Sequence, residues 1–284
     1  MSPSDSGLSL GGIFSQKISV NKKLFSKFGL SPLLGPSFSD NEIIKTINKF
    51  KLNFSLPKKI EKDISNEISR NKIVGIFNGR AEFGQRSLGS RSILADPRNK
   101  LSKNTLNQKI KRRDWFMPFA PAIIDSEFKK FFNTMLPSLY MQKAEVINQK
   151  YKKLIPSAVH INNTCRAQYV DKKIFPFFWN IINEFYKKTS VPILLNTSFN
   201  RHGISTICSP RQAIEHILEG NIDVLYLEKY KIEFSKNRKY KRENFKFRSD
   251  KDELFTECKK WFKNNKFKMS SIAKNRYKNY LNNL

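Results

Sequence analysis

The sequence predicts an α/β (α+β) domain, in which a twisted mixed sheet carries flanking helices, followed by a basic C-terminal extension. Short apolar runs of strand-like composition alternate with amphipathic segments of helical period, which is the pattern of such a domain. A hydrophobic content of 39% and an aromatic content of 13% indicate a folded core, because disordered chains are poor in aromatic residues. The alternation ends near residue 230, where a segment rich in Lys, Arg and Asn begins.

The helices are predicted from capping signals and apolar spacing. Ser39 followed by Glu42 is a capping-box pattern, and the isoleucines that follow it recur at helical spacing. Near the end of the domain, Ser209 is expected to cap a helix that has Pro210 at its first position and Gly220 after its last turn. Further helices are expected over residues 59–69, 99–110 and 176–188.

The strands are predicted from β-branched runs between turn signals. Residues 72–77 (KIVGIF) form such a run, closed by an Asn-Gly pair. Two prolines within residues 115–125 predict an edge strand or a loop that leads into a strand, because proline cannot donate to a central ladder. Residues 157–170 are expected to form two strands joined by an Asn-Asn turn. The remaining strands are expected at 92–95, 191–198 and 221–228, the last of them closing the domain.

The charge balance indicates the class of partner. A formal net charge of +29 favours an anionic partner such as nucleic acid, an acidic membrane surface or a phosphorylated small molecule. The joint abundance of Lys, Asn and Ile is equally what an AT-rich genome produces without selection for binding. The three cysteines are odd in number and far apart, so they predict neither a disulfide framework nor a metal knuckle. With no signal-like start and no apolar run of membrane length, we expect a cytoplasmic protein with no membrane partner.

A glycine-rich, arginine-rich loop follows the first predicted strand, in the stretch NGRAEFGQRSLGSRS. The guanidinium group presents a planar fork of donors that matches phosphate oxygens, and glycine lets the backbone approach an anion closely. Arg86 and Arg91 in this loop therefore suit a phosphorylated ligand, although surface loops of this composition also occur without one. We expect Glu82 to hold one of the loop arginines by a bidentate ion pair.

Two shorter patterns carry polar side chains of the same kind. If residues 109–115 are extended, Lys111 and Arg113 project from one face and can clamp a polyphosphate; the alternative is an ordinary solvated basic face. Ser198 and Asn200 stand two apart just beyond a predicted buried strand, where hydroxyl and amide groups can bond phosphate or carbonyl oxygens. Their alternative is plain turn chemistry, because Asn and Ser are good turn formers.

Together, in this order and spacing, these segments resemble the C-terminal region of the O-carbamoyltransferases of the nodulation-protein U and tobramycin-carbamoylating type. The resemblance covers about residues 1–228 and departs from the family in places, with Met117 where many members have arginine. The family's Gly-Arg-x-Glu-x-Gly-x-Arg-x-Leu-Gly-x-Arg-Ser pattern is matched from Gly79 to Ser92, its Lys-x-Arg at Lys111 and Arg113, its Pro-Phe-Ala-Pro at 118–121, its His-x-x-x-x-x-Arg-x-Gln at His160, Arg166 and Gln168, and its Leu-Asn-Thr-Ser-Phe-Asn at 195–200.

The resemblance implies a YrdC-like fold for residues 35–230 and the formation of carbamoyl-adenylate from carbamoyl phosphate and ATP. It implies that Mg²⁺ accompanies the nucleotide and that this chain itself provides no metal site. It also implies roles for seven side chains. Lys111, Arg113 and Arg166 would be catalytic, and Arg86, Arg91, Ser198 and Asn200 would bind the nucleotide and its phosphates.

Family members also carry a long N-terminal domain with a Kae1-like, actin-like fold, which transfers the carbamoyl group to an acceptor hydroxyl. Residues 1–34 resemble the end of that domain and a linker, with Asp5 at the place of a metal ligand. The family's His-x-x-x-His pair has no counterpart among His160, His202 and His216. We therefore expect the transferase half, with its iron or other divalent metal, to be a separately encoded partner; the alternative is that this chain is a truncated remnant.

Three functions stay open at the level of sequence. The first is the adenylate-forming half of a carbamoyltransferase that works with a partner chain. The second is an RNA-binding module, because aromatic residues interleave with Lys and Arg in residues 231–284, although a solvated helix or packing arm has the same composition. The third is an inactive remnant. The acceptor molecule is not specified by any of these residues.

Overall fold

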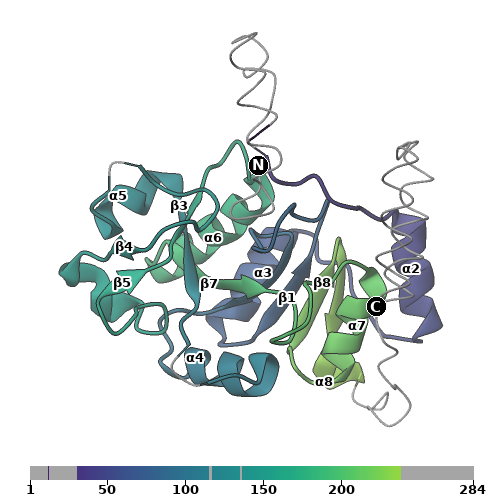
Figure 1. Cartoon of the computed structure of the whole chain (residues 1–284). Helices are drawn as coiled ribbons and strands as arrows, with labels where there is room; N and C mark the ends of the chain where they lie inside the picture. The colour runs from purple at the N-terminus through teal and green to yellow at the C-terminus, as the bar shows by residue number, and fades with distance from the viewer. Residues whose placement is uncertain (1–11, 13–30, 115–116, 135, 238–284) are drawn as a thin grey trace, which may run out of the picture. The chain divides into compact units, whose positions relative to one another are not determined.

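The computed structural model describes Gly12 and residues 31–114, 117–134 and 136–237 of the chain (Figure 1). Within these residues, seven strands form one mixed sheet in the order β6-β3-β7-β2-β1-β8-β9, and β4 and β5 form a second, small sheet. The strands are β1 Val74–Phe77, β2 Arg91–Ala95, β3 Ala120–Ile124, β4 Glu145–Val146, β5 Thr164–Cys165, β6 Gln168–Val170, β7 Ile193–Ser198, β8 Val224–Leu227 and β9 Tyr230–Glu233. The predicted α/β class, a mixed sheet with flanking helices, is confirmed.

The sheet combines antiparallel and parallel pairs. Strand β7 lies between β3 and β2 and pairs antiparallel with both, while β1 pairs parallel with β8 and β3 pairs parallel with β6. Every residue of β1, β2 and β3 is buried, so both faces of these central strands are covered. The centre of the sheet is therefore a fixed platform, and the segments that leave β7 and enter β2 start from rigid positions.

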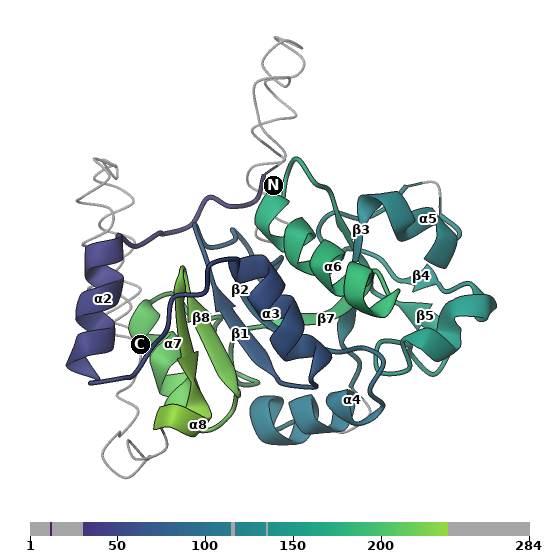
Figure 2. The ribbon, with the colours of Figure 1, turned by 180° about the vertical axis from the view of Figure 1, so that it is seen from behind.

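Helices α2, α3, α6 and α7 lie where the sequence predicts them, whereas the helix expected over 99–110 is the short α4 continued by the π-helical η3. Ser39 caps α2 in a complete capping box with Glu42, and Ser209 caps α7 in a second one with Gln212. Helices α3 and α6 pack against each other and lie in front of the strands in Figure 2. The described helices are α2 Asp40–Lys49, α3 Ile60–Ser69, α4 Leu101–Thr105, the π-helical η3 Leu106–Lys111, the 3₁₀ turns η4 Asp125–Glu127 and η5 Gln149–Leu154, α5 Phe128–Phe131, α6 Pro176–Thr189, α7 Pro210–Leu218 and α8 Phe234–Asn237.

Three expectations differ from the structure. The proline-containing segment does enter a strand through a loop, but β3 lies inside the sheet, because β6 pairs with it from Ala122 onward, just after Pro121. The expected turn is present, with Asn163 in the left-handed region, but residues 157–161 form no strand, because β5 after the turn pairs with β4 instead. The last described strand is β9 rather than the segment 221–228, so the sheet continues past the expected boundary at residue 230.

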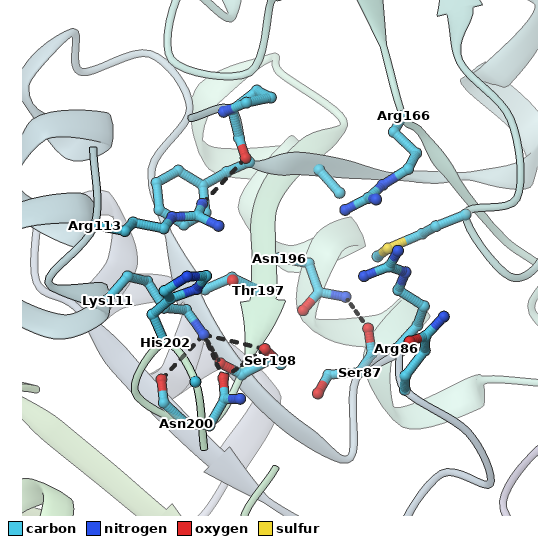
Figure 3. Close-up of a pocket in the computed structure, with 16 residues that line it drawn as sticks. Arg86, Ser87, Lys111, Arg113, Arg166, Asn196, Thr197, Ser198, Asn200 and His202 are labelled. Atoms are coloured by element: carbon cyan, nitrogen blue, oxygen red, sulfur yellow. Dashed lines mark hydrogen bonds between the residues drawn. The ribbon is translucent and has the colours of Figure 1, made fainter. Parts of the chain in front are cut away.

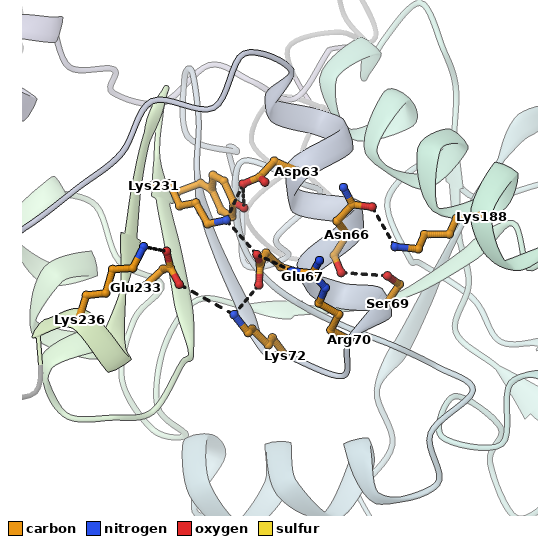
Figure 4. Close-up of polar contacts among 11 residues, drawn as sticks. Asp63, Asn66, Glu67, Ser69, Arg70, Lys72, Lys188, Lys231, Glu233 and Lys236 are labelled. Carbon is orange, nitrogen blue, oxygen red and sulfur yellow. Dashed lines mark hydrogen bonds and ion pairs between the residues drawn. The ribbon is translucent and has the colours of Figure 1, made fainter.

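An ion-pair cluster joins β9, near the end of the described chain, to α3 (Figure 4). The Lys231 ammonium of β9 lies 2.8 Å from a carboxylate oxygen of Asp63 and 2.9 Å from one of Glu67, both on α3. Glu67 is buried and also pairs with Lys72 at 2.6 Å. These cations hold the pKa of Glu67 below its ordinary value although burial acts the other way. The cluster therefore fixes β9 against α3.

Two sequence predictions fall outside the described residues. The expected linker and domain end in residues 1–34 is described only at Gly12 and from residue 31, and most of the basic extension, 238–284, is not described. Within the described residues, no helix combines the length and the apolar character needed to cross a membrane.

Candidate functional site

Segments that are far apart in the sequence line one cavity of about 290 Å³ (Figure 3). Its charged side chains come from the loop between β1 and β2, from the end of η3 and the turn after it, and from the segment between β5 and β6, and the end of β7 with the loop after it adds polar groups. Residues 118–120 at the start of β3 and Met141 complete the lining. Of the seven predicted site residues, six lie in this lining: Arg86, Lys111, Arg113, Arg166, Ser198 and Asn200. The structure thus brings together side chains that the sequence connects only by motif order.

Lys111 is the most buried cation of the cavity, with 3% of its surface exposed. Its ammonium donates to the carbonyl oxygen and hydroxyl of Ser198 at 2.6 and 3.0 Å, and to the carbonyl and side-chain oxygens of Asn200 at 3.0 and 2.6 Å. All four acceptors are neutral, so no carboxylate offsets the cost of burying this charge. Burial, with a smaller contribution from the charge of Arg113, lowers the pKa of Lys111 to about 7.

The position of Lys111 follows from its local backbone. It is the last residue of the π-helical segment η3, and Arg112 after it takes the left-handed conformation, with φ of 48°. This reverses the chain, so that the Arg113 N–H donates back to the Asn107 carbonyl oxygen. The Lys111 carbonyl oxygen in turn accepts from the His202 N–H, which ties the loop after β7 to this turn. The expectation of an extended backbone here is therefore wrong, although both cations still reach one cavity.

Arg113 is held in place by its own neighbours. Its Nε donates to the Asn107 side-chain oxygen at 2.7 Å, one terminal nitrogen donates to the Pro118 carbonyl oxygen at 3.2 Å, and the guanidinium lies 4.6 Å from the centre of the Phe119 ring. Partial burial lowers its pKa below the ordinary value. The guanidinium is therefore oriented before any ligand arrives.

Arg86 and Arg166 lie on the other side of the cavity in Figure 3. Burial lowers the pKa of Arg166, and the charges of Arg86 and Arg113 lower it further. The Nε of Arg166 is buried and has no acceptor among the described residues. No Asp or Glu belongs to the described lining of the cavity, so its four cations face one another without a compensating charge. Such a site attracts an anion with several oxygens.

The loop that carries Arg86 is shaped by Glu82 and Gly89. One carboxylate oxygen of Glu82 accepts the N–H groups of Leu88 at 2.7 Å, Ser90 at 2.7 Å and Arg91 at 3.3 Å. The expected bidentate pair with an arginine is therefore wrong within the described residues, because the loop backbone supplies the donors. Gly89 has φ of 119°, and a Cβ there would lie 2.6 Å from the Phe178 ring, so the loop approaches α6 too closely for any side chain.

Arg91 occupies a different place from the other six predicted residues. It is fully buried, and its terminal nitrogens donate to the carbonyl oxygens of Asn78, Gly79, Ser90 and Pro36 at 3.0 to 3.3 Å. The guanidinium also lies 3.5 Å from the centre of the Phe77 ring. It lines a second hollow, of about 470 Å³, rather than the first. Its contacts fix the backbone of the loop and leave little of the group for a ligand.

The second hollow adjoins the first. Arg86, Ser87 and Asn200 line both, so the two hollows meet along one wall. The volume of the first hollow alone is at the lower limit of the volumes found for small-molecule sites. The second hollow adds further volume beyond Arg86.

Some lining residues were not singled out from the sequence, among them Ser87, Asn196 and His202. Asn196 stands two residues before Ser198 on β7, so strand alternation alone places the two on one face. Gln168, known only from the motif, is fully buried and bonds to Asn196. His160 lies outside the described lining and bonds through Nδ1 to the Thr164 hydroxyl at 2.9 Å.

The lining does not suit a metal ion held by the protein. It contains no carboxylate among the described residues, and no group of three His, Cys, Asp or Glu side chains elsewhere in the described part of the chain could hold one. The arrangement can instead bind and orient a polyanion, and Lys111 can exchange a proton near neutral pH.

Comparison with known proteins gives a family match and several relatives. A family model described as Carbamoyltransferase C-terminus matches residues 65–233, more than half of the chain. Uncharacterized protein MJ1058 of Methanocaldococcus jannaschii is 33% identical over 204 residues, which are 70% of this chain and 34% of that protein. Nodulation protein NolNO of Sinorhizobium fredii is 36% identical over 170 residues, 58% of this chain and 25% of that protein.

Nodulation protein U of Rhizobium fredii is 28% identical over 213 residues, which are 75% of this chain and 35% of that protein. The chain therefore spans about a quarter to a third of the length of these relatives. Among solved structures, the crystal structure of full-length HypF in the phosphate- and nucleotide-bound form is 18% identical with a TM-score of 0.44, covering 62% of this chain and 26% of that one. A likeness of this degree assigns neither a ligand nor an activity.

Proposed function

The chain belongs to the carbamoyltransferase C-terminus family, and from that premise we propose that it forms carbamoyl-adenylate from carbamoyl phosphate and ATP. The observation that carries the proposal is the cavity in which Lys111, Arg113, Arg86 and Arg166 converge without an acidic neighbour in its described lining. Both substrates are polyanions, and the mixed anhydride that joins them carries negative oxygens on two sides.

The atoms balance when one water molecule is consumed. Water displaces phosphate from the carbamoyl group and gives carbamate, and both protons of the water leave with the phosphate. A carbamate oxygen then attacks the α-phosphorus of ATP and expels pyrophosphate, which leaves carbamoyl-adenylate. Both displacements pass through states in which charge builds up on non-bridging and leaving oxygens, so fixed cations and positioning supply most of the acceleration.

The position of each cation in the cavity indicates which part of the ligand it would bind. Lys111, whose hydrogens are held by Ser198 and Asn200, lies at one side and contributes its positive charge to the phosphate that arrives there. Arg113 is oriented by Asn107 and approaches from above Phe119. Arg166 has a buried Nε without an acceptor among the described residues, which a phosphate oxygen would satisfy.

The nucleotide would bring its own Mg²⁺. The described lining provides no carboxylate for the ion, so we assign no residue of this chain to it and no step of the reaction. When bound between phosphates, such an ion neutralises their oxygens.

The acceptor-transfer step belongs in this proposal to another polypeptide segment. The relatives are about three times longer than the region they share with this chain, so the full reaction needs sequence that the matched region does not contain. A Kae1-like half, separately encoded, would receive the adenylate and pass its carbamoyl group to an acceptor hydroxyl.

Calorimetric titration of the full chain with carbamoyl phosphate and with a nonhydrolysable ATP analogue tests the proposal. Both ligands are expected to bind. Arg166→Gln removes one unpaired cation and is expected to weaken carbamoyl phosphate binding roughly tenfold to a hundredfold, because hydrogen bonds to charged groups are worth about 1.5–3 kcal/mol. Release of pyrophosphate from ATP should fall with it.

Arg112→Gln is the matched control. Arg112 stands between Lys111 and Arg113 but is exposed and lies outside the described lining of the cavity. The control removes the same charge from the same turn and should change affinity by less than about twofold. The proposal is lost if neither ligand binds the unaltered chain, or if the control variant is as defective as Arg166→Gln.

A further inference from the structure

A buried carboxamide lies at the centre of the cavity. Asn196 is 1% exposed, belongs to β7 and lines the cavity between the Lys111 side and the Arg86 side (Figure 3). Its Nδ2 donates to the Ser87 carbonyl oxygen at 3.0 Å and to the Gln168 side-chain oxygen at 2.8 Å. Both amide hydrogens are therefore used, one to hold the loop between β1 and β2 and the other to bond Gln168 of β6.

These contacts fix which end of the carboxamide faces the cavity. Turning it over would set its oxygen against two other acceptors, the Ser87 carbonyl and the Gln168 side-chain oxygen. Gln168 cannot turn to compensate, because its own Nε2 donates to the Leu88 carbonyl oxygen at 3.1 Å. The network therefore determines the orientation, and Asn196 Oδ1 points away from Ser87, toward the side of Ser198 and Lys111 in Figure 3.

The oxygen so oriented is buried and has no donor among the described residues. The charged groups that face it, Arg86, Arg113 and Arg166, are donors only, and the oxygens of Ser198 and Asn200 already accept from Lys111. The ionised phosphate group of an acyl phosphate offers only acceptors at neutral pH and cannot satisfy an acceptor. A ligand that fits this position must carry an N–H or O–H donor beside its anionic group.

We infer that Asn196 Oδ1 accepts an N–H of the carbamoyl group and thereby selects carbamoyl phosphate over acyl phosphates without an N–H. This inference rests on the proposed function and adds the group that reads the –NH₂ end of the substrate. Acetyl phosphate is the matched competitor, because it replaces –NH₂ by –CH₃ at nearly the same size. A site built to bond an N–H rejects an analogue without it, since its own acceptor then stays unpaired.

The test compares three ligands by calorimetry on the full chain: carbamoyl phosphate, acetyl phosphate and inorganic phosphate. The unaltered chain should bind carbamoyl phosphate roughly tenfold to a hundredfold more tightly than acetyl phosphate. Asn196→Ala should remove this preference while the affinity for inorganic phosphate changes little. Retained phosphate affinity also shows that the variant is folded around its cations.

Ser87→Ala is the control, because the Ser87 hydroxyl is an uncharged buried cavity group that, like Asn196 Oδ1, has no partner among the described residues. It should leave the preference intact. The inference is overturned if the unaltered chain binds the two acyl phosphates equally, a result that needs no variant, or if Ser87→Ala alone removes the preference. Absence of binding by all three ligands overturns the proposed function itself, whereas equal binding overturns only the role of Asn196.

Discussion

At the scale of single residues, the site depends on a lysine that is charged only part of the time. Lys111 has a pKa of about 7, because it is buried on four neutral oxygens and lies near Arg113. An anion bound beside it would favour the ammonium form and raise that pKa. Between the two values, binding takes up a proton, so affinity for the anion falls as the pH rises.

Titration of the full chain with inorganic phosphate from about pH 7.5 to about pH 9.5 should show this linkage. The ligand is mostly the dianion at the start of that range and almost entirely so at its end, so its own ionisation would raise the affinity for a cationic site and cannot cause a fall. Affinity is expected to fall by up to about tenfold per pH unit, because one proton is taken up on binding. Lys111→Met should bind more weakly and with a flat profile, and an equally steep profile in that variant would show that another group titrates.

Site residues could be predicted from the sequence where the ligand requires a particular chemical group. They could not be predicted where the backbone geometry determines whether that group reaches the cavity. Guanidinium, ammonium and hydroxyl groups are those that bind phosphate oxygens, and this chemistry indicated Arg166, Lys111 and Ser198. All three line the cavity. Arg91 has the same guanidinium group and Glu82 a carboxylate, but both form their hydrogen bonds with backbone groups of the loop. Which polar atoms a turn leaves unsatisfied depends on its backbone path, and a residue pattern does not contain that path.

At the scale of elements, the loop between β1 and β2 can be tested through its glycines. Gly89→Ala adds a Cβ 2.6 Å from the Phe178 ring at φ of 119°, so both sterics and backbone oppose it. We expect a loss of about 2–4 kcal/mol in unfolding free energy, measured by denaturant titration. Anion affinity should fall as well, since Arg86 is carried by the same loop.

Gly79→Ala provides the comparison, because Gly79 also has positive φ, 57°, but a Cβ there meets nothing within 4 Å. Only the backbone cost of about 1 kcal/mol is expected. If the two variants lose equal stability, close packing of Gly89 on α6 does not shape the loop.

Element prediction succeeded where a local signal and the tertiary fold agree. The capping boxes of α2 and α7 specify helix starts through hydrogen bonds within four residues, and both helices begin where expected. Residues 157–161 alternate like a strand but find no partner, because β5 pairs with the short β4 instead. Strand formation depends on a neighbour elsewhere in the chain, and alternation within one segment cannot reveal it.

At the scale of the whole described chain, β9 and α3 are joined by the cluster around Lys231 across more than 160 residues of sequence. Lys231→Met should leave Glu67, which is buried, with less compensation of its charge. We expect a loss of about 2–4 kcal/mol in unfolding free energy by denaturant titration.

Lys236→Met is the matched control, because Lys236 pairs with Glu233 at 2.6 Å but is 61% exposed at its side chain. A surface pair of this kind contributes about 0–1 kcal/mol, so the control should change little. If the two variants lost equal amounts of unfolding free energy, the burial of Glu67 would not be the reason that this cluster stabilises the fold.

The π-helical turn before Lys111 has a consequence for how the site can be lost. A π turn holds more residues than the 3.6 of an α turn, so the segment Leu106–Lys111 is one residue longer than an unbroken α-helix would require. Winding the same residues as a regular α-helix, with none removed, would swing the lysine by roughly 100° around the axis, away from Ser198. Every cation would still be encoded, yet the cavity would no longer contain its ammonium; the wider winding of this one turn is as much a part of the site as the residues that it carries.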